Sequence, residues 1–117
     1  MTENEIKEII TLVCAELKLR KPKLRLHYRG GSYYYPHKRG NGLISLSLNE
    51  HPLGITNSIL HELAHHAEWM KNGRSRSEKH RSHGPHFKAW LKRIAEAWYG
   101  DASLYPWQHE YKSLRSN

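Results

Sequence analysis

The segment His61-Glu62-Leu63-Ala64-His65 carries the clearest chemistry in this chain, because two histidines four residues apart enclose a glutamate. Residues four apart on a helix lie one above the other, so His61 and His65 can bind the same metal ion. Glu62 points roughly 100° round the helix from His61, where its carboxylate can act on water without being a ligand. The spacing therefore predicts one zinc ion per chain, with Glu62 as the general base of a hydrolytic reaction.

A catalytic zinc ion needs a third protein ligand and one position left open for water. The downstream segment His83-Gly84-Pro85-His86-Phe87 offers two histidines. His83 is the preferred third ligand, because it lies just before the helix that Pro85 is expected to begin and can be aimed from a fixed turn. Glu96 would serve if the third ligand were a carboxylate. Three residues therefore remain as alternatives to His83: His80, His86 and Glu96.

Three helices and three strands are expected to position these residues. Helical periodicity predicts helices at about 3–19, 55–71 and 85–99, and Thr2 with Glu5 has the form of a capping box. Alternating or aromatic runs predict strands at about 24–29, 33–35 and 43–48. Turns at Gly30-Gly31 and Asn41-Gly42 favour an antiparallel meander of these strands. The predicted class is α+β, with an active-site helix after the sheet, then a basic loop and a final helix.

Length and composition limit the remaining possibilities. A chain of 117 residues suits a single domain, with a core at about 3–100 and an aromatic tail at 101–117. Cys14 is the only cysteine, which excludes an intramolecular disulfide and a cysteine-based zinc ribbon. The polar start and the lack of a long apolar run favour the cytoplasm, or association with the nucleoid, and no membrane partner. The chain is expected to be a monomer.

The net charge of +8 and the sequence pI near 9.7 suit a polyanionic partner, above all nucleic acid, although simple solubility would also explain them. Basic residues concentrate in the predicted loop and continue onto the outer face of the last helix. The candidate DNA contacts are Arg74, Arg76, Lys79, Arg81, Lys88 and Lys92.

The combination of HELAH, a basic loop and HGPHF resembles the SprT-like metalloprotease domain of the Spartan-related family. The resemblance covers about residues 5–99. It implies zinc binding by His61, His65 and His83, catalysis by Glu62, a zincin-like fold, and a protease that acts on flexible or DNA-crosslinked protein. One departure is His86, at a position where relatives such as Spartan carry Glu.

Two other functions stay open. The first is a zinc-stabilised nucleic-acid-binding module without hydrolytic activity, and the second is a peptide-binding relative that has lost activity. Glu62 argues against the first, because a purely structural site does not need a glutamate between its histidines.

Substrate is expected to bind as an added strand in extended conformation. The strand at 43–48 directly precedes the active-site helix, so we expect it to be the sheet edge that borders the cleft. Its small residues would leave the outer side open, which makes Ser45, Leu46 and Ser47 the candidate substrate contacts. Tyr33, Tyr34 and Tyr35 are candidate donors to the oxyanion of the reaction, although strand tyrosines more often serve packing.

Overall fold

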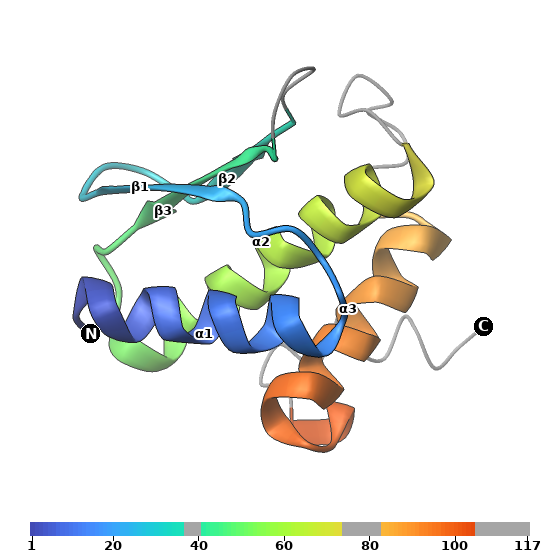
Figure 1. Cartoon of the computed structure of the whole chain (residues 1–117). Coiled ribbons are helices and arrows are strands. Elements are labelled where there is room, and N and C mark those ends of the chain that lie inside the picture. The colour runs from blue at the N-terminus through green and yellow to red at the C-terminus, as the bar shows by residue number, and fades with distance from the viewer. Residues whose placement is uncertain (37–40, 74–82, 105–117) are drawn as a thin grey trace.

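The chain folds as a helix, three strands and two further helices, and the computed structural model describes residues 1–36, 41–73 and 83–104. Figure 1 shows the sheet on one side of a layer of helices, with α1 and α2 crossing beneath it. The predicted α+β class is confirmed. No described helix is both long enough and apolar enough to cross a membrane. The elements are α1 (Glu3–Glu16), β1 (Lys23–His27), β2 (Tyr33–Tyr35), β3 (Leu43–Ser47), α2 (Pro52–Asn72), α3 (Pro85–Tyr99) and the short 3-10 helix η2 (Ala102–Leu104).

Helix α1 begins at the predicted capping box. The Thr2 hydroxyl accepts from the backbone N–H of Glu5 at 3.1 Å, and the Glu5 carboxylate accepts from the Thr2 N–H at 2.7 Å. These hydrogen bonds to Thr2 lower the pKa of Glu5. The helix ends at Glu16, earlier than predicted, because Lys18 takes a left-handed conformation with φ 55°. The N–H of Leu19 then bonds to the Cys14 carbonyl at 2.8 Å and closes the last turn.

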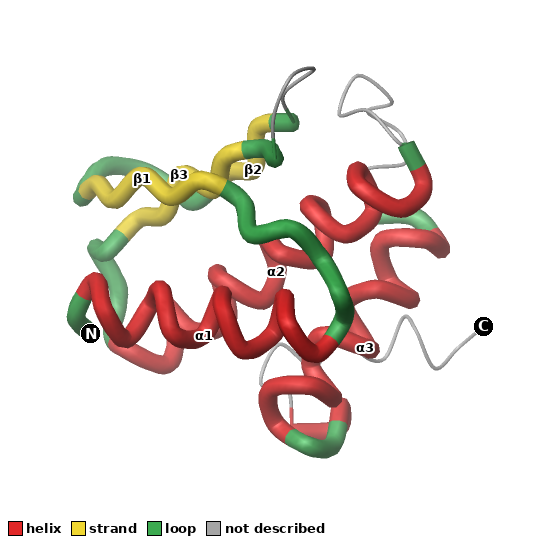
Figure 2. Tube along the Cα trace, in the orientation of Figure 1, coloured by secondary structure: helices red, strands yellow, loops and turns green. Residues whose placement is uncertain are grey.

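The sheet is mixed, and the predicted antiparallel meander is wrong. Its strand order is β1-β3-β2: β1 pairs with β3 in parallel, and β2 pairs with β3 antiparallel. The predicted hairpin between β2 and β3 is therefore confirmed, whereas no hairpin forms across Gly30-Gly31. Figure 2 shows the three strands as one small sheet above the helices. The last strand in sequence is thus the central strand in space.

Side-chain size explains why β3 takes the centre. Ile44 and Leu46 are fully buried toward the helices, and small Ser45 and Ser47 on the opposite side are also buried. The flanking strands carry long cationic and aromatic side chains, which need the space of an edge position. Two hydrogen bonds join the end of β3 to the segment that leads from β1 to β2. The Leu48 N–H donates to the His27 carbonyl at 2.8 Å, and the Ser47 N–H donates to the Ser32 hydroxyl at 2.9 Å.

Gly42, at the start of β3, lets the sheet close onto α2. Its φ is +82°, and a Cβ there would overlap the hydroxyl of Tyr34. A side chain at this position would therefore meet both backbone strain and a steric clash. The glycine leaves room for the Tyr34 ring to pass beneath the sheet toward α2.

Helix α2 begins at Pro52, earlier than predicted from the apolar pattern. The His51 ring accepts from the N–H of Gly54 at 3.3 Å and acts as the N-cap, and Pro52 occupies the first helical position. The helix ends at Asn72, one residue beyond the predicted end, and Gly73 follows in a left-handed conformation. Helix α3 begins at the predicted Pro85 and ends before Gly100.

Candidate metal centre

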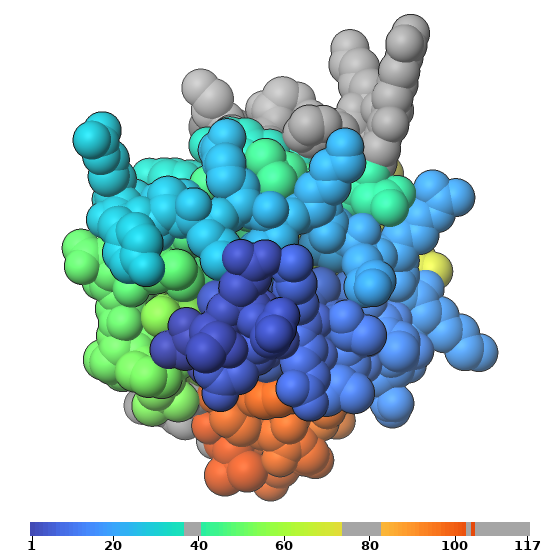
Figure 3. All heavy atoms as spheres, turned by 60° about the vertical axis from the view of Figure 1, so that its left-hand side comes forward, coloured from blue at the N-terminus to red at the C-terminus, as the bar shows by residue number. Residues whose placement is uncertain are grey.

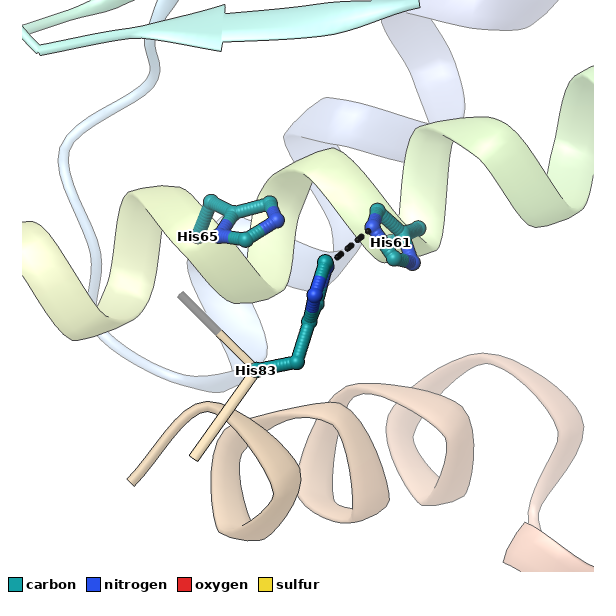
Figure 4. A group of neighbouring side chains, drawn as sticks. All are labelled: His61, His65 and His83. Atoms are coloured by element: carbon teal, nitrogen blue, oxygen red, sulfur yellow. Dashed lines mark hydrogen bonds between the residues drawn. The ribbon is translucent and has the colours of Figure 1, made fainter. Parts of the chain in front are cut away.

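Three histidines converge between α2 and the start of α3. His61 and His65 lie on successive turns of α2, and His83 reaches them from the two-residue turn that precedes Pro85 (Figure 4). The ring centroids lie 5.0 Å apart for His61 and His65, 5.1 Å for His61 and His83, and 5.0 Å for His65 and His83. One nitrogen from each ring lies within 4.8 Å of the other two. The structure thus brings together the three residues that the sequence predicted as ligands.

The spacing of these nitrogens fits a tetrahedral metal ion. The Nε2 atoms of His61 and His83 are 3.2 Å apart. Two nitrogen ligands of a tetrahedral zinc ion would be separated by roughly 3.3 Å, given Zn–N bonds near 2.05 Å. Three neutral imidazoles are a common zinc donor set, and they leave a fourth position for water or substrate. The donor set and its spacing therefore suit a catalytic zinc site.

Phe87 forms an apolar floor under the three rings. Its ring centroid lies 5.0 Å from that of His61, 4.4 Å from that of His65 and 4.8 Å from that of His83, and the side chain is 1% exposed. The sequence analysis gave Phe87 no role of its own within the segment His83-Gly84-Pro85-His86-Phe87, so this contact was missed. The signal was its place four residues after His83, one turn into the helix. An apolar floor restricts the rings and limits water beneath the site.

Asn72 ties the end of α2 to α3 and so fixes the approach of His83. Its side-chain oxygen accepts from the Trp90 indole N–H at 2.8 Å, and its side-chain nitrogen lies 3.3 Å from Nδ1 of His86. A second tie, at the far end of α3, joins the Tyr99 hydroxyl to the Asn57 side-chain oxygen at 2.8 Å. With α3 held at both ends, the turn that carries His83 is set against α2.

The alternative third ligands do not join the cluster within the described residues. His86 contacts Asn72 instead. Glu96 is exposed and lies roughly 16 Å along the α3 axis from Pro85, at 1.5 Å per residue. His80 lies outside the described residues. Among the described His, Cys, Asp and Glu residues, only His61, His65 and His83 form a group able to hold a metal ion.

His66, the residue after His65, faces away from the metal site and is fully buried. Its Nε2 lies 2.6 Å from the Arg20 carbonyl oxygen, and its Nδ1 lies 2.8 Å from the Tyr34 hydroxyl. A carbonyl can only accept, so Nε2–H donates to Arg20 and Nδ1 accepts from Tyr34. Burial lowers the pKa of His66, against the opposite effect of the Arg20 carbonyl, and burial raises the pKa of Tyr34. The ring joins α2 to β2 and to the segment after α1.

The predicted catalytic residue Glu62 lies on α2 next to His61 and is 6% exposed. Burial strengthens the electrostatic effect of a carboxylate on a nearby reacting group. Tyr34, one of the candidate oxyanion donors, is engaged with His66. Tyr33 is 53% exposed.

The predicted edge position of residues 43–48 is wrong, because β3 pairs on both sides. Ser45 faces Arg25 on one side and Tyr33 on the other, so its backbone lies inside the sheet. Ser45 and Ser47 are also buried, at 2% and 1% exposed, so the expected open outer side is absent. The reasoning that made Ser45, Leu46 and Ser47 substrate contacts therefore fails.

Most of the candidate DNA contacts lie outside the described residues: Arg74, Arg76, Lys79 and Arg81. On α3, Lys88 is half-buried and Lys92 is exposed. DNA binding through these residues stays a prediction. The part of the predicted aromatic tail from residue 105 onward also lies outside the described residues.

Comparison with known proteins gives one result beyond the geometry. The model of the SprT-like family matches residues 7–106. No curated protein and no solved structure matches the chain. The matched segment runs from α1 through η2 and contains all three clustered histidines.

Proposed function

This chain belongs to the SprT-like family, and from that membership and the histidine cluster we propose that it is a zinc-dependent metallopeptidase acting on flexible or unfolded protein segments. The observation that carries the proposal is the convergence of His61, His65 and His83, with their nitrogens within 4.8 Å of one another. When bound there, zinc would supply a Lewis acid that polarises a scissile carbonyl and lowers the pKa of water. The remaining steps are assigned to side chains of the protein.

Glu62 is the general base in this proposal. It follows His61 directly, so its side chain leaves α2 beside the ligand pair. Its carboxylate accepts the proton of the attacking water and then delivers it to the leaving amine. Because Glu62 is 6% exposed, the proton transfer takes place largely shielded from bulk water.

The number of clustered ligands favours hydrolysis over a purely structural zinc site. Structural sites are usually closed by four protein ligands, whereas catalytic sites keep one position open. Within the described residues the group contains three ligands. This is the main argument against the alternative of a zinc-stabilised nucleic-acid-binding module.

Glu62→Gln tests the proposal directly. We expect the variant to keep its zinc and its unfolding midpoint, and to lose at least about 100-fold in the rate of peptide hydrolysis, the lower range for a general base. Zinc content by mass spectrometry and cleavage of an unfolded protein substrate are measured on the same preparation. Undiminished hydrolysis by Glu62→Gln at full zinc content would remove Glu62 from the mechanism.

Strand β2 is the better candidate for substrate binding now that β3 is central. Within the described part of the chain it is an edge of the sheet, and its Tyr34 contacts His66 on α2, next to the ligand His65. In this proposal an extended substrate pairs with the free side of β2 through backbone hydrogen bonds. Such pairing depends little on the side chains of the substrate, and it favours flexible segments because they can adopt an extended conformation.

Peptides methylated at single backbone nitrogens test this pairing without altering the protein. Methylation at the nitrogens that face β2 should raise KM, whereas methylation at the alternate nitrogens should not, because alternate N–H groups of a strand point to opposite sides. If methylation at every position has the same effect, substrate does not bind as a strand.

A further inference from the structure

The face of the sheet that points away from the helices has an unusual composition. Ile44, Leu46 and Tyr34 belong to the core, so the residues that alternate with them point outward. In Figures 1 and 2 the described helices all lie on the other side. We call this surface the outer face, and its residues are Lys23, Arg25 and His27 on β1, Leu43, Ser45 and Ser47 on β3, and Tyr33 and Tyr35 on β2.

Aromatic rings and a guanidinium lie side by side across the outer face. The ring centroids of Tyr33 and Tyr35 are 6.4 Å apart with an interplanar angle of 41°, so neither ring lies flat on the other. The Arg25 guanidinium carbon lies 5.9 Å from the Tyr35 ring centroid. Arg25 also donates to the Ser45 hydroxyl from Nη2 at 3.2 Å and from Nε at 3.4 Å. These contacts hold Arg25 over the central strand.

The small serines of β3 make this arrangement possible. Ser45 stands between Arg25 and Tyr33 in the strand register, and it is buried although it points outward. A large side chain in place of Ser45 would keep the side chains of β1 and β2 apart. The small serine lets the side chains of these two edge strands extend toward each other across the sheet. The accessible part of the outer face is therefore formed by side chains of the two edge strands, and the serines of β3 lie buried between them.

The segment that carries the outer face is also strongly cationic. Between Leu17 and Asn49 the sequence has eight lysines and arginines and no acidic residue. Arg29 and Tyr28, in the loop after β1, are exposed beside the face, and Tyr28 is 71% exposed. Figure 3 shows long side chains of this blue-to-cyan part of the chain extending outward from the surface. The eight basic residues are Lys18, Arg20, Lys21, Lys23, Arg25, Arg29, Lys38 and Arg39.

We propose that the outer face binds single-stranded nucleic acid, with Tyr33 and Tyr35 stacking on bases and Lys23 and Arg25 contacting phosphates. Tyr33 is exposed and Tyr35 is half-buried. Accessible rings with interspersed cations are the combination that recognises unpaired strands, because every base has a stacking face and every nucleotide a phosphate. A duplex keeps its bases stacked inside and would leave the tyrosines without a partner. This surface differs from Lys88 and Lys92 on α3 and requires no hydrolysis, so its failure would be distinct from failure of the proposed peptidase.

The first test measures the role of the rings by fluorescence anisotropy, using the full chain and a labelled oligothymidine of about 12 nucleotides. Tyr33→Leu and Tyr35→Leu should each weaken binding about tenfold, whereas Tyr33→Phe and Tyr35→Phe should bind like the wild type because they keep the stacking surface. A duplex of the same length should bind more weakly and lose little affinity in the leucine variants. If the leucine variants bind normally, or the phenylalanine variants lose as much as they do, base stacking on this face is refuted.

The second test compares the two basic surfaces at equal change of charge. Lys23→Ala with Arg25→Ala should lower the affinity for oligothymidine and reduce the slope of log K against log salt by about 1.4, at about 0.7 per phosphate contact. Lys88→Ala with Lys92→Ala should change both much less. If the Lys88 and Lys92 variant instead lost more affinity and more salt dependence, the nucleic acid would bind at α3 and the proposal would be overturned. Parallel titrations with oligouridine separate RNA from DNA, and tighter binding of either one supports the same surface.

Discussion

Two adjacent histidines on α2 have opposite environments. His65 is half-buried, and its ring lies 5.0 Å from each of two other imidazoles and 4.4 Å from Phe87. His66 is fully buried, and its two ring nitrogens meet the Tyr34 hydroxyl and the Arg20 carbonyl. One residue along a helix is a rotation of roughly 100°, which is enough to move a ring from the histidine cluster to the core.

The comparison shows that partners, rather than residue type, decide what a histidine does. His65 faces groups that can share a cation with it, because an imidazole can present a lone pair to a metal. His66 faces one group that donates and one that accepts, so both of its nitrogens are used inside the protein. The first arrangement fits metal binding, and the second fits a link between α2, β2 and the segment after α1.

The largest expected difference is in metal binding. Replacing His61, His65 or His83 by Ala should lower zinc affinity by about 100- to 1000-fold, as expected when one of a few ligands shares a total binding energy of about 10–16 kcal/mol. His66→Ala is the matched control and should keep one zinc per folded chain. Competition with a chromophoric chelator measures the affinities. Full zinc affinity in His83→Ala would show that the third ligand lies elsewhere.

The next effect is on stability and should reverse the ranking of the two histidines. In the absence of metal, His66→Ala should lower the free energy of unfolding by about 3 kcal/mol, because it leaves a cavity and two buried polar groups without their partner. His65→Ala should change it by no more than about 0.5 kcal/mol. Urea unfolding with chelator present gives both values. If both variants lose the same free energy of unfolding, the buried position of His66 does not stabilise the fold more than the position of His65 does.

A smaller effect isolates one hydrogen bond of His66. Tyr34→Phe removes the hydroxyl that donates to Nδ1 while keeping the ring, so the free energy of unfolding should fall by about 1.5 kcal/mol. Tyr33→Phe, on the exposed neighbour, should change it by less than about 0.5 kcal/mol. The same urea experiment measures both variants. If Tyr34→Phe is as stable as the wild type, the hydrogen bond between Tyr34 and His66 contributes little to the stability of the protein.

The smallest effect concerns the geometry of the metal site at a distance. Asn72→Ala removes the bond to Trp90 that fixes α3, and with it the position of His83. Zinc affinity should fall about tenfold, the lower range for losing a group that orients a ligand. His86→Ala removes only the longer contact to Asn72 and should have less effect. Unchanged zinc affinity in Asn72→Ala would show that the turn at His83 holds its position without this tie.

Sequence patterns predicted the elements that depend on a few neighbouring residues. The Thr2–Glu5 capping box and the helix start at Pro85 were predicted correctly, and the end of α2 was predicted to within one residue, because each is formed by contacts within one helical turn. The early start of α2 was missed because the cap is His51, a residue type that is rarely an N-cap. The ends of helices were less predictable where one residue, such as Lys18, takes an unusual conformation.

The strand order could not be predicted in the same way. Alternation identified the three strands, and Asn41-Gly42 correctly indicated the hairpin between β2 and β3. The partner of β1 depended on which strand could be buried on both faces, and small Ser45 and Ser47 made that strand β3. This choice is a competition among all three strands and the helices beneath them. Local turn signals carry no information about it.

The sequence alone determined that His61 and His65 could share a metal ion, because their spacing on a helix is fixed by the geometry of the backbone. It also indicated His83, through its place before a helix start. Only the tertiary structure decided that His83 reaches the pair, that Phe87 lies beneath all three rings, and that His66 turns into the core. Those outcomes depend on how α3 and the sheet pack against α2, and packing between distant segments is set by the burial of whole faces rather than by any short motif.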